Sequence, residues 1–221
     1  MEQTVTIVIP ALNAATVLGP TLAACAEAEA PILVIDGGST DATAAIARAA
    51  GARVIVAARG RGLQLTAGGA AAQSPWLLFL HADTRLAPGW WAAIQPAIGQ
   101  PDRAWYFRFA LDDPGSQARR LERLVAWRCR LFALPYGDQG LLISQALYTQ
   151  LGGFRPLPLM EDVDLVRRLG RSRLGALPIA ALTSATRWQR EGWWRRSARN
   201  LLCLLLWFLG ISPTTIKRLY G

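Results

Sequence analysis

Three aspartates stand at positions where a carboxylate could take part in chemistry. Asp36 directly follows the apolar run Ile32–Ile35, Asp83 follows the apolar run Trp76–Leu80, and Asp162 opens a stretch with helical spacing. Ligands of open parallel sheets bind beyond the carboxyl ends of the strands, so polar residues that end an apolar strand are the first candidates for a site. We therefore expect Asp36 and Asp83 to lie at one ligand-binding edge of a sheet.

Asp36 heads the segment Asp36–Asp41, in which two glycines follow it. Its carboxylate can accept hydrogen bonds from a base or a ribose, and Gly37 lets the backbone approach a ligand closely. The alternative is that the segment serves only the following helix, with Ser39 or Asp41 as the cap. Such a cap leaves Asp36 unexplained, so we expect Asp36 to bind a ligand.

Asp83 is placed to hold a divalent cation against a diphosphate. Mg²⁺ takes one or two carboxylates, and substrate phosphates and water complete its coordination, so one protein carboxylate is sufficient. The alternative is a turn-forming aspartate before Thr84. His81 is the only histidine in the chain, which excludes a histidine-rich metal site.

Two further segments carry polar side chains that could contact a ligand. Arg59, Arg61 and Gln64 lie in and after a Gly-rich loop that opens a helix, where side chains and backbone amides can bind phosphates. A solvated basic loop is the alternative. Asp138 and Gln139 precede a short strand, and taken alone they indicate a plain turn.

Glu161 and Asp162 stand at the start of a predicted helix over Met160–Leu169. Taken alone, they are ordinary first-turn acids, which the helix dipole favours. A carboxylate such as that of Asp162 can act as a general base that removes a proton from an attacking hydroxyl, but nothing in this segment alone requires that role. Asp164 lies about 200° further round the helix axis, so we expect it to face away and to tolerate Asn.

These residues need elements that position them, and the apolar pattern predicts alternating strands and helices. The predicted strands are Val5–Ile9, Ile32–Ile35, Val54–Ala57 and Trp76–Leu80, and the predicted helices are Thr16–Ala30, Ala42–Ala50, one that ends at Ala72, and Trp90–Ile98. Strands that alternate with helices at this spacing imply a parallel sheet covered on both faces. After Gln100 we expect an antiparallel strand over Trp105–Leu111, a basic helix over Gln117–Phe132 and a short strand over Gly140–Ile143.

Length and composition limit the classes of protein. The chain has 221 residues, 52% of them hydrophobic and 18% charged, which predicts one substantial core rather than two ordinary domains. A formal net charge of +9 favours an anionic partner: nucleotide, nucleic acid or acidic membrane. Cys25, Cys129 and Cys203 are far apart, which indicates neither a disulfide framework nor a zinc cluster. Met1–Thr4 lead straight into a strand, so we expect no secretory signal and a reducing cytosol.

The last part of the chain differs in kind from the rest. Arg187–Arg199 is dense in arginine and tryptophan, and Leu201–Leu209 is an almost unbroken apolar run. This run is about half of the roughly 20 apolar residues that a bilayer span needs, so it should not cross a membrane alone. It suits an interfacial anchor on anionic lipid. The alternative is a helix packed on the domain or in a dimer.

Four motifs occur in order along the chain. They are VIPALN at Val8–Asn13, DGGSTD at Asp36–Asp41, HAD at His81–Asp83, and the pair Glu161–Asp162. This ordered set, over roughly residues 4 to 190, resembles the family 2 glycosyltransferases of the GT-A fold. A compact bacterial subgroup of predicted glycosyltransferases is most similar, judging by the segments Arg59–Gly69 and Gly137–Gly140.

The resemblance implies that one group of residues binds a nucleotide-sugar donor. Pro10, Leu12 and Asn13 match the first nucleotide-contacting loop, and Asp36 matches the carboxylate that meets the base. The whole implied donor group is Pro10, Leu12, Asn13, Asp36, Gly37, Arg59, Arg61, Gln64 and Ala82.

The resemblance also implies a metal site, a catalytic base and an acceptor side. Asp83 matches the last, metal-binding residue of the family's D-x-D motif, with Mg²⁺ or Mn²⁺ as the cofactor, and His81 stands where the first Asp is usual. Asp162 matches the catalytic base of inverting members. The implied acceptor side consists of Asp138, Gln139 and Glu161.

We therefore predict an inverting glycosyltransferase that moves a sugar from a nucleoside-diphosphate donor to a hydroxyl acceptor, lipid-linked or otherwise close to a membrane. The predicted architecture is α/β: a GT-A domain over 1–190, with a Rossmann-like, mostly parallel central sheet flanked by helices, and an amphipathic to apolar helical appendage over 191–221. The expected location is the cytoplasm, free or peripheral on the inner face of the cell membrane, with no nucleic-acid partner.

Two other classes stay open at this point. A nucleotidyltransferase shares Rossmann-like nucleotide binding, but it ordinarily needs a Gly-rich, Lys-bearing N-terminal loop, which Pro10–Ala15 lacks. A non-enzymatic basic module for nucleic acid or lipid would explain the charge. It gives no reason for acidic residues at successive strand ends, because they repel phosphate without a metal. The sequence leaves the sugar, the base, the acceptor and the oligomeric state undetermined.

Overall fold

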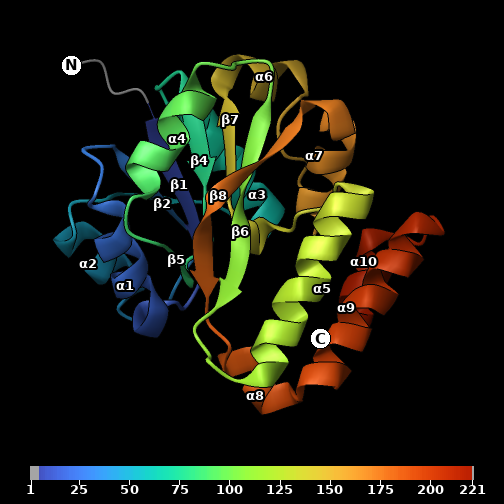
Figure 1. Cartoon of the computed structure of the whole chain (residues 1–221). Coiled ribbons are helices and arrows are strands. Elements are labelled where there is room, and N and C mark those ends of the chain that lie inside the picture. The colour runs from blue at the N-terminus through green and yellow to red at the C-terminus, as the bar shows by residue number, and fades with distance from the viewer. Residues whose placement is uncertain (1–4, 221) are drawn as a thin grey trace.

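The computed structural model describes residues 5–220 and is centred on an 8-stranded sheet (Figure 1). The strands lie in the order β3-β2-β1-β4-β7-β6-β8-β5. Their bounds are β1 Val5–Ala11, β2 Ile32–Asp36, β3 Arg53–Val56, β4 Trp76–Phe79, β5 Thr84–Leu86, β6 Ala104–Leu111, β7 Leu141–Ser144 and β8 Leu174–Thr183.

The first four strands form a parallel half that confirms the predicted Rossmann-like pattern. β1 lies between β2 and β4 and pairs in parallel with both, and β3 pairs with β2. All seven residues of β1 are buried, as expected for a parallel strand that is covered on both faces. The carboxyl ends of β1, β2 and β4 therefore meet at one edge, where Asp36 ends β2 and Asp83 follows β4.

Helices cover both faces of this half, as Figure 1 shows. On one face lie α1 Ala15–Cys25, α2 Thr43–Ala49 and α4 Trp90–Ile98, and on the other lie α3 Arg61–Ala71, α6 Gln145–Gln150 and α7 Glu161–Leu169. Alternate residues of β1 enter different cores. Ile7 and Ile9 pack with the first group of helices and Val8 packs with the second, as the two-residue period of a strand requires.

The second half of the sheet is mixed in direction. β7 pairs antiparallel with β4 and β6, and β8 pairs parallel with β6 and antiparallel with β5. The predicted strand over Trp105–Leu111 is confirmed as β6. It is antiparallel to β7 over only two residue pairs, and most of its length runs parallel to β8. The sequence did not predict β8, whose alanine-rich segment contains Pro178 and lacks a clear alternation.

One helix ends earlier than predicted. We expected a helix over Thr16–Ala30, but α1 ends at Cys25. Ala30 precedes Pro31, and a residue before proline is disfavoured in the helical region. The chain also has to turn into β2, and the N–H of Ala28 closes that turn on the carbonyl of Cys25 at 3.2 Å.

The C-terminal part of the chain forms three helices: α8 Thr186–Glu191, α9 Trp193–Phe208 and α10 Pro213–Tyr220. Cys203, Leu204 and Ile216 are buried in a cluster with Met160 and Val163 at the start of α7. One side of the predicted apolar run thus packs on the domain, while other leucines of the run are exposed. The division at residue 190 stays a prediction. Within residues 5–220, no helix has both the length and the apolar character to span a membrane.

Candidate active site

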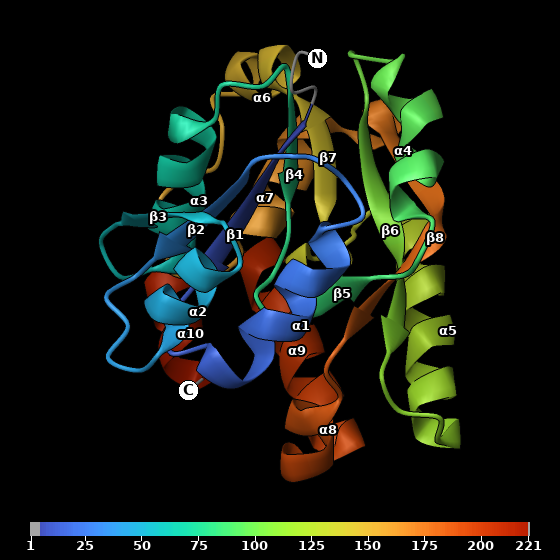
Figure 2. The ribbon, with the colours of Figure 1, turned by 90° about the vertical axis from the view of Figure 1, so that its left-hand side faces the viewer.

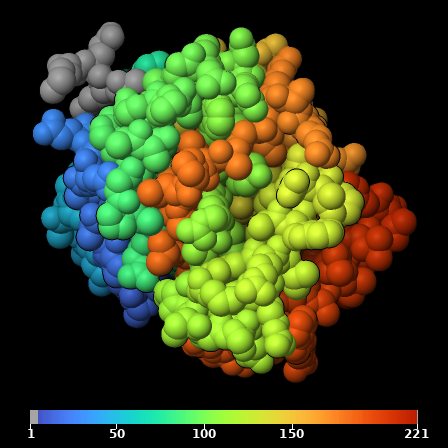
Figure 3. All heavy atoms as spheres, viewed as in Figure 1, coloured from blue at the N-terminus to red at the C-terminus, as the bar shows by residue number. Residues whose placement is uncertain are grey.

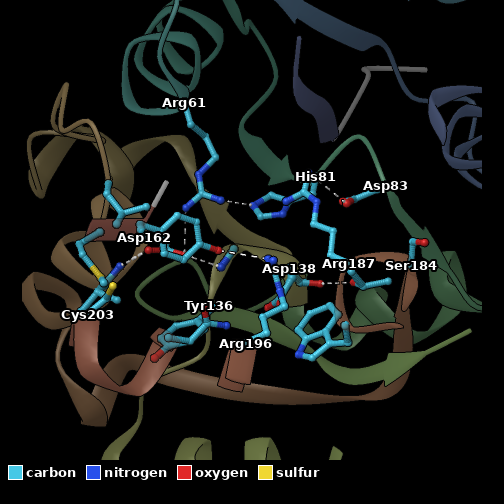
Figure 4. Close-up of a pocket in the computed structure, with 18 residues that line it drawn as sticks. Arg61, His81, Asp83, Tyr136, Asp138, Asp162, Ser184, Arg187, Arg196 and Cys203 are labelled. Carbon is cyan, nitrogen blue, oxygen red and sulfur yellow. Dashed lines mark hydrogen bonds and ion pairs between the residues drawn. The ribbon is translucent and has the colours of Figure 1, made fainter. Parts of the chain in front are cut away.

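A pocket of about 170 Å³ lies between the end of β4, the start of α7 and the C-terminal helices (Figure 4). Its lining comprises acidic, basic and apolar side chains. The residues are Arg61, His81, Asp83, Tyr136, Gly137, Asp138, Leu159, Met160, Asp162, Val163, Thr183, Ser184, Arg187, Trp188, Arg196, Asn200, Cys203 and Tyr220. The structure thus brings Asp83, Asp138 and Asp162 together from three distant segments of the chain.

Asp162 is fixed in this pocket by backbone donors. Met160 adopts a left-handed conformation with φ of 66°, and α7 begins directly after it, so Asp162 lies in the first turn. The N–H of Gly137 donates to Asp162 Oδ2 at 2.7 Å, and the N–H of Val163 donates to Oδ1 at 2.8 Å. A side chain 14% exposed therefore keeps one orientation while still lining the pocket.

Arg61 links Asp162 to its acidic neighbour. Its Nε donates to Glu161 Oε1, and its Nη2 lies 3.7 Å from Asp162 Oδ2. Although burial disfavours its charge, the carboxylates of Glu161 and Asp162 raise the pKa of Arg61 above its ordinary value. Glu161 itself is fully buried, so its carboxylate serves the ion pair and does not line the pocket.

His81 is neutral at physiological pH. Burial, followed by the Arg61 guanidinium, lowers the pKa of His81 to about 4. Its Nε2 faces Arg61 Nη1 at 3.3 Å, and because the guanidinium can only donate, Nε2 accepts. A Cβ added at Gly137 would lie 2.5 Å from His81 Nε2, so only glycine lets this loop approach His81 and Asp162 closely.

Asp138 lines the pocket, and one of its carboxylate oxygens is buried without a hydrogen-bond partner. Burial raises the pKa of Asp138 to about 6, and Asp162 and Asp83 add to the rise against the opposing charge of Arg128. Oδ1 is the unpartnered atom. The adjacent residue Gln139 does not line the pocket. It is buried and donates from Nε2 to the carbonyl of Phe107 at 3.1 Å, so it holds the loop.

Asp83 is the one residue for which the sequence predicts metal binding. Its carboxylate is 18% exposed, lines the pocket and lies 4.0 Å from Arg187 Nη2. Among residues 5–220, no three His, Cys, Asp or Glu side chains are grouped to hold a metal by themselves. A single carboxylate beside an open pocket fits a hard cation that receives its other ligands from phosphates and water.

The other predicted donor residues lie outside this pocket, around the ends of β1 and β2. Asp36 is buried, and its carboxylate accepts from the N–H of Ser39 at 3.1 and 3.2 Å. Asn13, with φ of 48°, accepts at Oδ1 from the N–H of Thr40 at 2.9 Å. The two loops are thereby tied together beside exposed Asn13. Asp41 accepts from Thr43 and Ala15, so the alternative role of this segment, in starting helices, operates as well.

The remaining donor-side residues differ in exposure. Gln64 Nε2 donates to the carbonyls of Ala11 and Ile35 at 2.8 and 2.7 Å and so fastens the ends of β1 and β2. Pro10 is buried in β1, Gly37 packs against Gln64, Leu12 and Ala82 are half-buried, and Arg59 is exposed before α3.

Asp164 faces away from the pocket, as its position on the helix predicted, but it is not at the surface. It is 7% exposed and binds Arg155 Nη1 at 3.0 Å and Arg168 Nη2 at 2.7 Å. The rotation along the helix is as expected. The opposite side of α7, however, is covered by the loop before it, to which Arg168 also donates at the carbonyl of Gly153.

Several pocket residues were not predicted, because they come from the C-terminal helices. Arg187 on α8, Arg196 and Asn200 on α9, and Tyr220 on α10 all line the pocket. Arg196 is 5% exposed and donates to Glu191 at 2.6 Å and to the Tyr220 hydroxyl at 3.2 Å. The signal was present in the dense arginine and tryptophan of residues 187–199, but only the chain path shows which arginines turn inward.

A mostly parallel sheet flanked by helices, with carboxylates gathered at its strand ends, defines a GT-A glycosyltransferase. The chain belongs to glycosyl transferase family 2, whose family model matches residues 6–156. We found no match among curated protein sequences.

Solved structures confirm the fold. Glucosyl-3-phosphoglycerate synthase from Mycobacterium tuberculosis, in complex with Mn²⁺, UDP and glucosyl-3-phosphoglycerate, is 22% identical with a TM-score of 0.58, covering 82% of this chain and 70% of that one. The same enzyme with Mg²⁺ and UDP is 21% identical with a TM-score of 0.59 and the same coverage. A mycobacterial protein is 22% identical with a TM-score of 0.59, covering 82% of this chain. The present chain spans 65% of that protein's length.

Proposed function

We propose that this glycosyltransferase moves a sugar from a nucleoside-diphosphate donor to a hydroxyl acceptor with inversion, and that Asp162 is its catalytic base. The observation that carries the proposal is the Asp162 carboxylate, held by the N–H of Gly137 within a pocket that also contains Asp83. A fixed carboxylate facing a cavity can take the proton of a bound hydroxyl as attack proceeds. Inversion follows when that hydroxyl approaches from the side of the sugar opposite to the diphosphate.

The proposed donor site extends along the sheet edge from β2 to β4. The nucleoside lies over Pro10, Leu12, Asn13, Asp36 and Gly37, where the two tied loops support it. The diphosphate then reaches Asp83, and exposed Arg187, 4.0 Å from Asp83, is available to it. Solved relatives of this fold that contain UDP support a nucleoside-diphosphate donor.

The proposed cofactor is Mg²⁺ or Mn²⁺, held by Asp83 and by the donor phosphates. When bound, such a cation neutralises the charge that develops on the leaving diphosphate. The relatives with Mn²⁺ or Mg²⁺ support the choice of a divalent ion. Neutral His81 adds no positive charge that would oppose the cation.

Within this chain, Arg61 and Asp138 complete the proposed site. Arg61 neutralises Glu161 and keeps Asp162 in place. Asp138 lines the pocket, and its carboxylate orients the acceptor by accepting from a hydroxyl. Gln139 and Glu161 support this side from behind, because both are buried.

We further propose an acceptor that is lipid-linked or otherwise close to a membrane, and a protein that is cytoplasmic or peripheral on the inner face of the membrane. Two features support this proposal. Cys25, Cys129 and Cys203 are all free and buried, which suits a reducing compartment. The exposed side of Leu201–Leu209 suits contact with lipid.

A thermal-shift screen of the purified protein against UDP-, GDP- and dTDP-sugars with Mg²⁺ or Mn²⁺ tests the function. We expect one nucleotide series to raise the melting temperature, and to do so more strongly with the metal. Binding of RNA without a response to any nucleotide would instead support a basic binding module. Release of pyrophosphate from a nucleoside triphosphate and a sugar phosphate would support a nucleotidyltransferase.

A further inference from the structure

Exposed large apolar side chains are concentrated on one part of the described chain. Only Val56 and Leu63 lie elsewhere. The others are on α5, which spans Ser116–Phe132, on α9 and α10, and in the turn between them: Leu124, Trp127, Leu131, Phe132, Trp194, Leu201, Leu202, Leu205, Phe208, Leu209, Ile211 and Leu219. Soluble proteins rarely expose so many together unless the surface binds a partner.

α9 has two faces with different tasks. Arg196, Asn200 and Cys203, spaced four and three residues apart, line the pocket. Leu201 and Leu205, on the other side, are 67% and 54% exposed. α9 therefore separates the pocket from the apolar surface.

α5 also has one buried side and one exposed apolar side. Its Val125 and Cys129 are buried, whereas Leu124, Trp127 and Leu131, at spacings of three and four, are exposed. Trp127 is 68% exposed. We predicted only a basic helix here, so the apolar stripe on α5 is a property that the structure adds.

The two exposed stripes belong to one surface. Figure 3 shows the atoms of α5 next to those of the C-terminal helices on one face of the molecule, although the two helix axes lie apart in Figure 2. At one end, Leu124 and Trp194 line the same shallow hollow. At the other end, the last turn of α7 and the residues after it lie between the two helices. Arg171 donates to the carbonyl of Leu131 on α5 at 2.9 Å, and the guanidinium of Arg167 lies 4.9 Å from the centre of the Phe208 ring on α9.

The charge of this surface is positive. α9 and α10 contain no acidic residue, and α5 contains only Glu122, which is occupied by Arg119 and by the N–H of Leu111. The exposed basic side chains beside the apolar ones are Arg120, Arg123, Arg130, Arg195, Lys217 and Arg218. A second copy docked symmetrically through the same face would bring these like charges together. An anionic lipid surface meets both the charge and the apolar side chains.

We propose that α5 and α9–α10 together form one bilayer-binding face. In this proposal α5 inserts apolar side chains into the bilayer, as the C-terminal helices do. The leucines and tryptophans enter the headgroup layer, and the arginines pair with anionic lipid. The pocket, one helix behind this face, is then held at the level of the headgroups. That placement of the acceptor depends on the proposed transfer reaction, whereas the membrane contact does not.

Cosedimentation of the full chain with vesicles of phosphatidylcholine, with or without phosphatidylglycerol, tests the proposal. The double variant Trp127→Ser with Leu131→Ser leaves the C-terminal helices unchanged. We expect its partition onto phosphatidylglycerol vesicles to fall by about tenfold or more, because two apolar side chains no longer enter lipid. Val56→Ser with Leu63→Ser, also exposed apolar residues but outside the face, should partition like the wild type.

A second double variant, Arg120→Glu with Arg123→Glu, keeps every apolar residue and should lose the preference for phosphatidylglycerol. Either α5 variant binding vesicles like the wild type would overturn the proposal. It would also be overturned if the wild type eluted as a dimer and the Trp127 variant as a monomer, since the face would then join protein copies. Thermal stabilisation by UDP with Mn²⁺ is measured on each variant. Its absence in the wild type would count against the proposed function alone.

Discussion

The N–H of Gly137 donates a 2.7 Å hydrogen bond to Asp162 Oδ2, and so joins the loop before β7 to the first turn of α7. Asp162→Asn keeps the size of this side chain but removes its proton acceptor. We expect sugar transfer to fall by about 10² to 10⁴-fold, the usual contribution of a general base. Donor affinity should change little, and turnover and nucleotide binding measured on the same preparation separate the two effects.

Asp102→Asn is the matched control, because Asp102 is an exposed aspartate outside the pocket. It should transfer at the wild-type rate. If Asp162→Asn also kept that rate, Asp162 would not be the base, and the inverting mechanism would need another one.

Asp83→Ala should remove the effect of the metal on nucleotide binding. Asp83 follows a strand end and is partly exposed, so we expect the fold to remain intact. Calorimetry of UDP with and without Mn²⁺ should show enhancement by the metal in the wild type and none in the variant. An undiminished enhancement would mean that another group holds the cation.

Asp138→Asn should stabilise the metal-free protein at neutral pH. Burial holds the pKa of Asp138 at about 6 in the folded protein, against 3.8 for an unperturbed aspartate. The folded state therefore binds the proton more tightly, and the free energy of unfolding falls as pH rises between these values. Because one pKa unit corresponds to about 1.4 kcal/mol, we expect a gain of up to about 3 kcal/mol above pH 6.

Urea unfolding of both proteins between pH 3 and pH 8 measures this difference. The curves should converge at the acid end, where the Asp138 carboxyl of the wild type is neutral in both states. A gap that does not depend on pH would show that the amide acts through its hydrogen bonds instead.

Asp164→Asn should destabilise the protein, contrary to what helical periodicity alone suggests. The variant removes a buried negative charge that is bound by Arg155 and Arg168. Because a charged partner left unpaired carries a desolvation penalty, we expect a loss of about 1–3 kcal/mol in the free energy of unfolding. Denaturant unfolding beside Asp102→Asn checks it, and equal midpoints would mean that the pairs contribute nothing.

The parallel half of the fold was predictable because its strands are buried, so the hydrophobic residue types alone indicate where they lie. β1 consists of apolar residues ended by Pro10, and the polar residues after β2 and β4 lie at the predicted sheet edge. Periodicity failed where partners came from distant segments. It gave the rotation of Asp164 correctly but could not show the loop that covers it.

The candidate site was predictable only in part, for the same reason. Asp83, Asp138 and Asp162 line one pocket, and their roles there stay predictions. Gln64 and Glu161 were predicted to contact substrates, yet the first binds two carbonyls and the second binds Arg61, both inside the protein. A polar residue indicates that its side chain has a hydrogen-bonding partner. Whether this partner is a ligand or another part of the protein depends on packing that a single sequence does not show.

Because α9 separates the pocket from the exposed apolar surface, its length cannot change freely. Each residue of an α-helix turns the chain by about 100°. Deleting one residue before Arg196 would carry Asn200 and Cys203 away from the pocket and bring exposed leucines toward it. A substitution changes only one face of α9, whereas a single insertion or deletion disturbs both faces at once. A change of about two whole turns, seven residues, would keep both registers to within about 20°, whereas a change of one or two residues would not. Natural variants of this chain should therefore differ in the composition of α9 more often than by one or two residues in its length.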